Sequence, residues 1–258
     1  MISSLQQRPK PAAGRPVTVL FDLDDTLFAH RRAVAIGITA YRTGAGGAGG
    51  GGADVDRGDE AEAERWRALE EKHYHRYLAG DISFQGQRRA RSREFTALYG
   101  HNLELDAAAD SWFDGYREEY ESAGMLHDDA VSCLTRLRAN GARLGIITNG
   151  ELAFQREKID RVGLTLLIDD VVASGELGIA KPDRRIFEHA CARFEVITSD
   201  AIYIGDRLET DAIGAARAGL QGVWLNRSGG ATAAEQAAAA ASGVSIIRSL
   251  DELIPLFS

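Results

Sequence analysis

The chain has 258 residues, of which 45% are hydrophobic and 26% are charged, and this composition excludes a chain that is disordered throughout. Its formal net charge of -8 argues against broad binding of nucleic-acid polymers or anionic membranes, although a local basic pocket for a small phosphorylated molecule is compatible with it. The sequence has no apolar signal region and no run of about 18 apolar residues, and its two cysteines are too few for a disulfide framework. We therefore expect a cytoplasmic protein without a membrane span.

An apolar strand that ends in carboxylates opens the predicted fold, after a flexible tail at residues 1–16. Residues 17–21, with the sequence VTVLF, favour β-structure and are too short for a helix, which is typical of a strand buried on both faces of a parallel sheet. Asp22, Asp24 and Asp25 follow at once. Because a buried carboxylate is costly unless it is paired, hydrogen-bonded or metal-bound, the cluster indicates a cation or a reaction. Taken alone, the stretch fits a turn and a helix cap better than a catalytic site.

Helical patterns then follow one another without an intervening strand. They cover residues 29–41, 60–78, 84–99 and 107–120. Between the first two, residues 44–52 read GAGGAGGGG, a low-complexity loop that fits a tolerated surface insertion better than a mobile gate. Four consecutive helices after the first strand predict an inserted helical-bundle domain at residues 29–124.

From residue 125 onward, helices and strands alternate. The predicted helices lie at residues 130–139, 152–162, 183–194, 211–218 and 231–241, and the predicted strands at residues 143–148, 168–173, 201–204, 222–225 and 244–247. This alternation predicts an α/β core at residues 17–28 and 125–258, with a Rossmann-like, doubly wound parallel sheet. Ligands of such sheets bind at the carboxyl ends of the strands.

Polar residues gather after several of these strands and before one helix. They are Asp22 and Asp24, Thr148 and Asn149, Asp206 and Asp211, and the pair Lys181-Pro182. Together they provide what phosphoryl transfer requires: an oxygen nucleophile, an acid, ligands for Mg²⁺, and cationic and hydroxyl donors for phosphoryl oxygens. A single site can account for all of them.

Four motifs in this chain resemble, in the same order, those of the haloacid dehalogenase superfamily of hydrolases. They are Asp22-Leu23-Asp24-Asp25-Thr26, Ile147-Thr148-Asn149-Gly150, Gly178-Ile179-Ala180-Lys181-Pro182-Asp183 and Gly205-Asp206-Arg207-Leu208-Glu209-Thr210-Asp211. The insertion at residues 29–124 is similar to the helical cap of the family's first cap class, which is found in its phosphatases. In those members the cap contacts the leaving group, so the resemblance implies that substrate choice lies in this segment.

The resemblance implies a role for each residue around the phosphoryl group. Asp22 would attack phosphorus and form a phosphoaspartate, and Asp24 would act as general acid and then as general base. Thr148 and the backbone of Asn149 would bind phosphoryl oxygens, and Lys181 would neutralise charge. From the residues alone, Thr148 also fits a helix cap, and Lys181 fits a solvated surface lysine.

The resemblance also implies a Mg²⁺ site. Asp206 would coordinate the ion beside Asp22 and the backbone carbonyl of Asp24, an oxygen-rich set of the kind that Mg²⁺ prefers. Asp211 would support the metal through water or hold Lys181. A charge in the first turn of the helix predicted at 211–218 is an almost equally good account of Asp211.

These observations predict a Mg²⁺-dependent phosphatase, monomeric or homodimeric, that acts on a small phosphorylated metabolite. The second and fourth motifs resemble those of members acting on nucleoside monophosphates or on N-acylneuraminate 9-phosphate, which leaves nucleotide and sugar substrates open. Position 24 is Asp, whereas the dehalogenase branch has Tyr, so carbon–halogen cleavage is disfavoured. A phosphomutase, or a catalytically silent regulator that binds phosphate, is the alternative.

Overall fold

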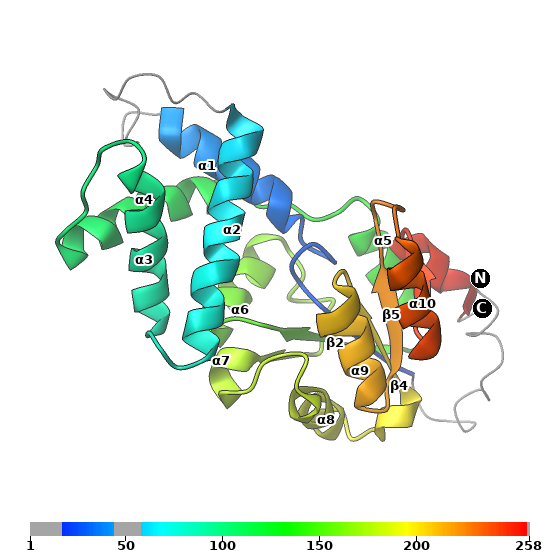
Figure 1. Ribbon diagram of the computed structural model, residues 1–258. Helices are drawn as coiled ribbons and strands as arrows, with labels where there is room; N and C mark the ends of the chain where they lie inside the picture. Colours follow the sequence, from blue (N-terminus) through cyan, green and yellow to red (C-terminus); the bar gives the residue numbers. More distant parts are fainter. Residues whose placement is uncertain (1–16, 44–57, 257–258) are drawn as a thin grey trace. The chain divides into compact units, whose positions relative to one another are not determined.

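The computed structural model describes residues 17–43 and 58–256, so the tail predicted at 1–16 and the glycine-rich loop predicted at 44–52 lie outside the described residues. The chain forms two compact units (Figure 1). One is His30–Met125, and the other combines the segment that ends at Ala29 with the segment that begins at Leu126. Within the described residues, no helix has both the length and the apolar character needed to cross a membrane.

A six-stranded parallel sheet forms the centre of the larger unit. Its strands are β1 (Thr18–Phe21), β2 (Arg143–Thr148), β3 (Asp170–Ala173), β4 (Ala201–Gly205), β5 (Gln221–Leu225) and β6 (Ser245–Ile247). Their order in the sheet is β3-β2-β1-β4-β5-β6, and neighbouring strands pair in parallel. The chain therefore adds β2 and β3 on one side of β1, and then β4, β5 and β6 on the other side. This order confirms the predicted doubly wound α/β fold.

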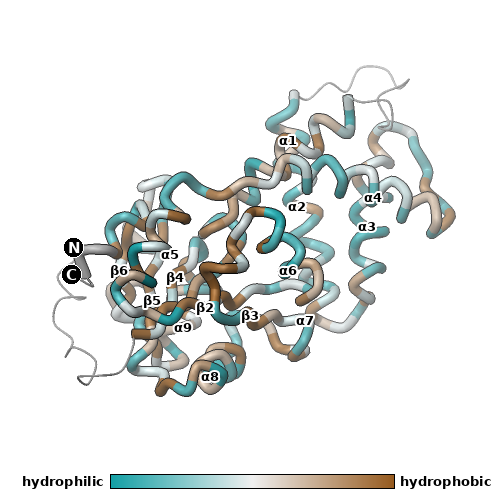
Figure 2. The backbone as a smooth tube through the Cα atoms, turned by 180° about the vertical axis from the view of Figure 1, so that it is seen from behind, coloured by the Kyte–Doolittle hydropathy of each residue, from teal (hydrophilic) through white to brown (hydrophobic). Residues whose placement is uncertain are grey.

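Helices connect the strands of this unit. They are α5 (Ala130–Ala139), α6 (Leu152–Arg161), α7 (Ser174–Leu177), α8 (Arg184–Arg193), α9 (Gly214–Arg217) and α10 (Ala233–Ala241), with short helical segments η2 (Thr198–Asp200), η3 (Leu208–Ile213) and η4 (Leu250–Leu256). Hydrophobic stretches of the chain concentrate along the sheet (Figure 2). On one face, Leu20 and Ile147 of the strands pack with Phe187 of α8 and Ala215 of α9. The sheet is thus the core that fixes the positions of the strand ends.

The smaller unit is a bundle of four helices: α1 (His30–Thr43), α2 (Asp59–Leu78), α3 (Phe84–Ala97) and α4 (Asp106–Ser122). Each packs against two others, α1 against α2 and α4, and α3 against α2 and α4. The Trp66 side chain is fully buried, and its ring lies 4.6 Å from that of Tyr116 and 5.2 Å from that of Phe95, measured between centroids. Trp66 therefore belongs to the core of the bundle.

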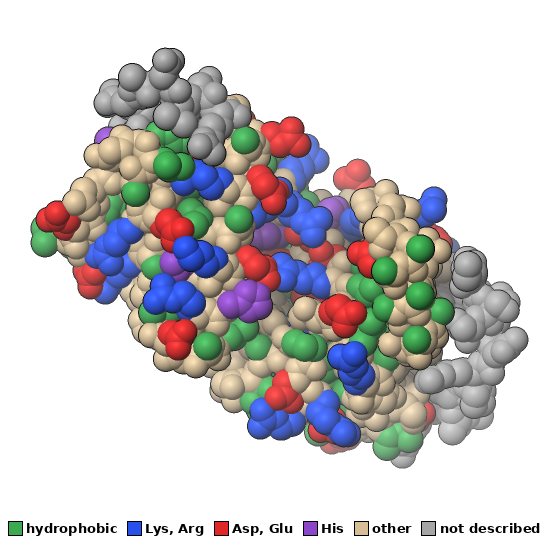
Figure 3. Space-filling model, in the orientation of Figure 1, with side chains coloured by type: hydrophobic (Ala, Val, Ile, Leu, Met, Phe, Trp, Pro, Cys, Tyr) green, Lys and Arg blue, Asp and Glu red, His purple; other side chains and the backbone are tan. Residues whose placement is uncertain are grey.

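On the face of this bundle that Figure 3 shows, acidic and basic side chains are interspersed among the described residues. Arg89 pairs with Asp106 and Asp110, and Lys72 pairs with Glu94. Exposed pairs of this kind contribute little to stability. The apolar interior is therefore the main source of stability in the bundle.

One predicted helix is wrong in its extent and type. In place of a single helix over residues 211–218, the chain forms the π-helical segment η3 and then the short helix α9. The wide turn begins at Arg207, whose carbonyl oxygen accepts from the backbone N–H groups of Asp211 and Ala212. Helix α7 and segment η4 were not predicted, because elements of four to seven residues are too short to show a helical period.

Candidate active site

The site lies where the winding of the sheet reverses, at the carboxyl end of the central strand β1. Strand β1 pairs with β2 on one side and with β4 on the other, so the residues after these three strands meet at one edge. The backbone N–H of Asp22 donates to the carbonyl oxygen of Ile204 at 2.8 Å, which extends the β1–β4 pairing by one residue. The sheet itself thus fixes the position of Asp22.

A tight turn carries the chain away from Asp22. The backbone N–H groups of Leu27 and Phe28 both donate to the carbonyl oxygen of Leu23, at 3.0 and 2.9 Å. Asp25 has φ of 61°, a left-handed conformation that Asp tolerates better than most residues. The Thr26 hydroxyl donates to Asp22 Oδ2 at 3.2 Å. The turn therefore leaves Asp25 a structural role and adds a donor to the Asp22 carboxylate.

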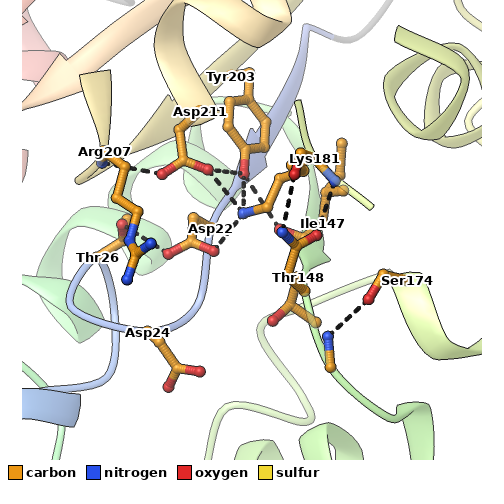
Figure 4. A network of polar contacts seen from close by, with 12 residues as sticks. Asp22, Asp24, Thr26, Ile147, Thr148, Ser174, Lys181, Tyr203, Arg207 and Asp211 are labelled. Atoms are coloured by element: carbon orange, nitrogen blue, oxygen red, sulfur yellow. Dashed lines mark hydrogen bonds and ion pairs between the residues drawn. The ribbon is translucent and has the colours of Figure 1, made fainter. Parts of the chain in front are cut away.

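One buried ammonium group joins two buried carboxylates (Figure 4). Lys181 Nζ donates to Asp22 Oδ1 at 2.6 Å and to Asp211 Oδ1 at 2.7 Å. It also donates to the Tyr203 hydroxyl at 2.8 Å, which in turn lies 3.1 Å from Asp211 Oδ1 and 3.2 Å from the carbonyl oxygen of Ile147. Lys181 is therefore a buried member of the cluster and not a solvated surface lysine.

Burial and the neighbouring charges shift the pKa values of Asp22 and Lys181. Burial, with smaller contributions from the Asp211 and Asp24 carboxylates, raises the pKa of Asp22 to about 7, although Lys181 acts in the opposite direction. Burial on its own would lower the pKa of Lys181, but the Asp211 and Asp22 carboxylates outweigh it and raise this pKa above its usual value. Lys181 stays charged, and Asp22 needs a further positive charge to be fully ionised near neutral pH.

Asp211 reaches the cluster from η3. Besides the contact with Lys181, its Oδ2 accepts from the backbone N–H of Arg207 at 3.0 Å, and its side chain is almost fully buried. A Cβ atom at Gly205 would lie 2.4 Å from Asp211 Cβ, so only glycine at the end of β4 leaves room for this side chain. Asp211 is therefore buried in direct contact with Lys181, and it lies in η3 and not in the first turn of the helix predicted at 211–218.

Thr148, at the end of β2, and Asn149, directly after it, form hydrogen bonds to other residues of the site. Asn149 donates through Nδ2 to the carbonyl oxygen of Lys181 at 3.1 Å and accepts the Lys181 backbone N–H at 2.8 Å, so its side chain fixes the backbone that carries Lys181. The buried Thr148 hydroxyl accepts from Gln155 Nε2 at 2.9 Å. Helix α6 begins after Glu151, without a side-chain cap. Thr148 is therefore not the cap of α6.

Three residues around the site were missed in the sequence: Tyr203, Gln155 and Lys158. Lys158 Nζ donates to Asp24 Oδ1 at 2.7 Å, and Gln155 Nε2 lies 3.4 Å from Asp24 Oδ2. Gln155 and Lys158 are three residues apart on α6, on one face of the helix, and both are buried. Polar residues on the core-facing side of the helix that follows the second motif are the signal that would have found them.

The donor set of the site fits a hard divalent cation. Asp22, Asp206 and Asp211 each offer a carboxylate oxygen, and these oxygens lie within 4.8 Å of one another. The Asp24 carboxylate is outside this group and pairs with Lys158. The backbone of Asp206 is fixed by Trp224, whose Nε1 donates to its carbonyl oxygen at 2.9 Å. Three carboxylates with one buried ammonium leave an excess of negative charge, which an oxygen-preferring ion such as Mg²⁺ would balance.

Two curated relatives share sequence with part of this chain. The N-acylneuraminate-9-phosphatase of Rattus norvegicus is 42% identical over 41% of this chain and 42% of its own length. The pyrimidine 5'-nucleotidase YjjG of Escherichia coli is 42% identical over 38% of this chain and 43% of its own length. The chain therefore spans less than half the length of these relatives.

A solved structure with the same fold matches almost the whole chain. The HAD-hydrolase YfnB from Bacillus subtilis, bound to magnesium, has a TM-score of 0.73 and 22% sequence identity, and the match covers 94% of this chain and 99% of YfnB. At this identity the likeness concerns the fold alone. The family model of the haloacid dehalogenase-like hydrolases matches residues 17–219, a stretch that contains all four motifs. The chain therefore belongs to the haloacid dehalogenase-like hydrolases.

Proposed function

We propose that this protein is a Mg²⁺-dependent phosphatase that hydrolyses a small phosphorylated metabolite through a phosphoaspartate on Asp22. The observation that carries the proposal is the buried Lys181 ammonium between Asp22 and Asp211, at the carboxyl end of the central strand. A carboxylate fixed by the sheet and backed by a buried cation is arranged for attack on an anionic phosphoryl group.

In the first step, an Asp22 carboxylate oxygen attacks phosphorus, and the bond between phosphorus and the ester oxygen breaks. Asp24 gives a proton to the departing oxygen, so the alcohol leaves neutral. Lys181 and the Thr148 hydroxyl stabilise the charge on the phosphoryl oxygens as the transition state forms. The products of this step are the free alcohol and an acyl phosphate on Asp22.

In the second step, water attacks the phosphorus of the acyl phosphate, and Asp24 accepts the proton that the water loses. The bond between phosphorus and the Asp22 oxygen breaks, which releases inorganic phosphate and restores the carboxylate. Asp22 and Asp206 would hold Mg²⁺, with Asp211 acting through Lys181. When bound, the ion neutralises phosphoryl charge and orients the phosphoryl group for in-line attack.

We further propose that the helical unit, His30–Met125, selects the substrate. The four motifs that supply the reactive groups all lie outside this unit. The names of the two relatives point to a sugar phosphate or a nucleoside monophosphate. Because Asp24 can donate and accept protons, we propose phosphate esters and not carbon–halogen bonds as the substrate class.

Release of inorganic phosphate from p-nitrophenyl phosphate tests the activity. We expect turnover by the wild type with Mg²⁺, loss of turnover with a chelator, and at least a thousandfold lower kcat in Asp22→Asn, because the amide is a poor nucleophile. Turnover by Asp22→Asn near the wild-type rate, or no turnover by the folded wild type, contradicts the proposal. A panel of nucleoside monophosphates and sugar phosphates, assayed for free phosphate, then identifies the substrate class and separates hydrolysis from transfer to a second hydroxyl.

A further inference from the structure

Helix α6 presents two buried polar side chains to the residues of the first two motifs. Lys158 reaches Asp24, and Gln155 reaches both Thr148 and Asp24. None of the four motifs contains either residue. Both nevertheless contact the carboxylate of Asp24, to which the proposed mechanism assigns both proton transfers.

The burial of the Lys158–Asp24 pair is asymmetric. The Lys158 side chain is 6% exposed, whereas that of Asp24 is 28% exposed. Lys158 Nζ also lies 4.9 Å from the centroid of the Phe28 ring and 5.3 Å from that of the Phe154 ring, and aromatic rings at these distances favour a cation. The lysine is thus the fixed partner, and it limits the directions that the more open carboxylate can take.

Gln155 completes this arrangement from the preceding turn of the same helix. Its Nε2 donates to Thr148 Oγ1 at 2.9 Å and lies 3.4 Å from Asp24 Oδ2, so one amide group links the two motifs. A Cβ atom at Gly150 would lie 2.7 Å from that Nε2, so a side chain at position 150 would displace the Gln155 amide. The two oxygens of Asp24 therefore face different donors, Oδ1 facing Lys158 and Oδ2 facing Gln155.

We propose that Lys158 and Gln155 are positioning residues that fix the orientation of the Asp24 carboxylate for proton transfer. This inference rests on the proposed phosphatase function and deepens it. In the first step an Asp24 oxygen must lie within hydrogen-bond distance of the leaving-group oxygen, and in the second step within that distance of the attacking water. A misplacement of about 1 Å can lower the rate by about a hundredfold. Neither residue is assigned a contact with substrate.

The Lys158→Met variant tests the claim, because it keeps an unbranched side chain at this buried position and removes the ammonium group. With an alkyl phosphate substrate we expect kcat to fall by about 10- to 100-fold and KM to change by less than about threefold. With p-nitrophenyl phosphate, the leaving group departs without a proton, so only the second step depends on Asp24. We therefore expect a rapid first turnover, seen as a burst of p-nitrophenolate, followed by a slow steady state.

Arg161→Met is the matched control. Arg161 lies on the same helix and pairs with Glu157 at 3.0 Å, but its side chain is 43% exposed. This variant loses the same charge and should keep wild-type kcat and KM. Equal kinetics in Lys158→Met and Arg161→Met would overturn the inference. A rise in KM at unchanged kcat would also overturn it, because that result assigns Lys158 to substrate binding.

A double-mutant cycle separates positioning from a general loss of structure. If Lys158 acts through Asp24, then adding Lys158→Met to Asp24→Asn lowers the remaining kcat by less than about twofold, whereas independent effects multiply. Gln155→Leu tests the same claim without removing a buried charge, and we expect about a fivefold loss of kcat in the same pattern. If Lys158→Met does not fold, an unchanged kcat in Gln155→Leu overturns the inference.

The same experiments distinguish failure of the proposed phosphatase function from failure of the proposed positioning role. A folded wild type without turnover refutes the phosphatase function itself, whereas an active wild type with Lys158→Met indistinguishable from the Arg161→Met control refutes only the positioning role.

Discussion

Asp22 is the residue on which the proposed reaction depends, and its surroundings disfavour the ionised form of its carboxyl group. Burial raises its pKa to about 7, and the Asp211 and Asp24 carboxylates act in the same direction. One ammonium shared between Asp22 and Asp211 cannot neutralise both carboxylates. A divalent cation beside Asp206 would favour the ionised form of Asp22, which is the form that attacks phosphorus.

The affinity of the protein for Mg²⁺ should therefore depend on pH. Binding of the ion requires the Asp22 carboxylate, so it displaces a proton when the pH is below the pKa of about 7. Raising the pH thus favours binding, and we expect the affinity to rise about tenfold between about pH 6 and about pH 8, with most of the rise at or below about pH 7. Titration calorimetry across this range measures it. An affinity that is constant or falls with rising pH contradicts the role of Asp22, and Asp22→Asn should lose the dependence.

At the scale of single elements, the turn of η3 and one face of helix α6 shape the site. The wide turn of η3 directs Asp211 to Lys181, and one face of α6 carries Gln155 and Lys158. The sequence predicts where long elements lie, because their hydrophobic periods extend over many residues. The Asp211 side chain in η3 contacts Lys181, thirty positions away in the chain, and no local sequence pattern reveals that contact.

Packing within the helical unit gives a prediction at this scale. A Cβ atom at Gly37 of α1 would lie 2.7 Å from backbone atoms of Tyr120 on α4, which cannot move aside without displacing the helix. Although Ala is favoured over Gly in an isolated helix by about 1 kcal/mol, we expect Gly37→Ala to lower the free energy of unfolding by about 1–3 kcal/mol. Denaturant unfolding followed by tryptophan fluorescence measures this, since Trp66 and Trp112 both lie in this unit.

The control for this prediction is Ile36→Ala, at a neighbouring position on α1 whose side chain is 42% exposed. It should change the free energy of unfolding by less than about 0.5 kcal/mol, as is usual for surface positions. A Gly37→Ala protein as stable as the wild type would show that the two helices can separate at little cost.

At the scale of the whole molecule, chain order explains why much of the site was predictable. Polar residues end or closely follow three of the predicted strands, and a parallel sheet brings the carboxyl ends of its strands to one edge, so the topology predicts that Asp22, Thr148 and Asp206 lie near one another. Tyr203 and Lys158 were not predicted from this topology. Tyr203 is a single polar group in an apolar strand, and Lys158 belongs to a helix outside the four motifs; each contacts the site through a partner that is distant in sequence.

The two units differ in what they contribute to the proposed function. The α/β unit contains every group that the proposed reaction uses, while the helical unit has its own aromatic core around Trp66. This division agrees with a reaction that is common to many substrates and a choice of substrate that is set elsewhere in the chain.

In the proposed reaction, the phosphoryl group is bound covalently to Asp22 before water releases it. Rapid mixing of the Lys158→Met protein with p-nitrophenyl phosphate and Mg²⁺, followed by acid quenching and peptide mass spectrometry, tests it most directly. We predict one phosphoryl group per chain, located by fragmentation on Asp22 and absent from Asp22→Asn. Steady turnover with no phosphorylated peptide in either the wild type or Lys158→Met, or a phosphoryl group on another residue, would contradict the account.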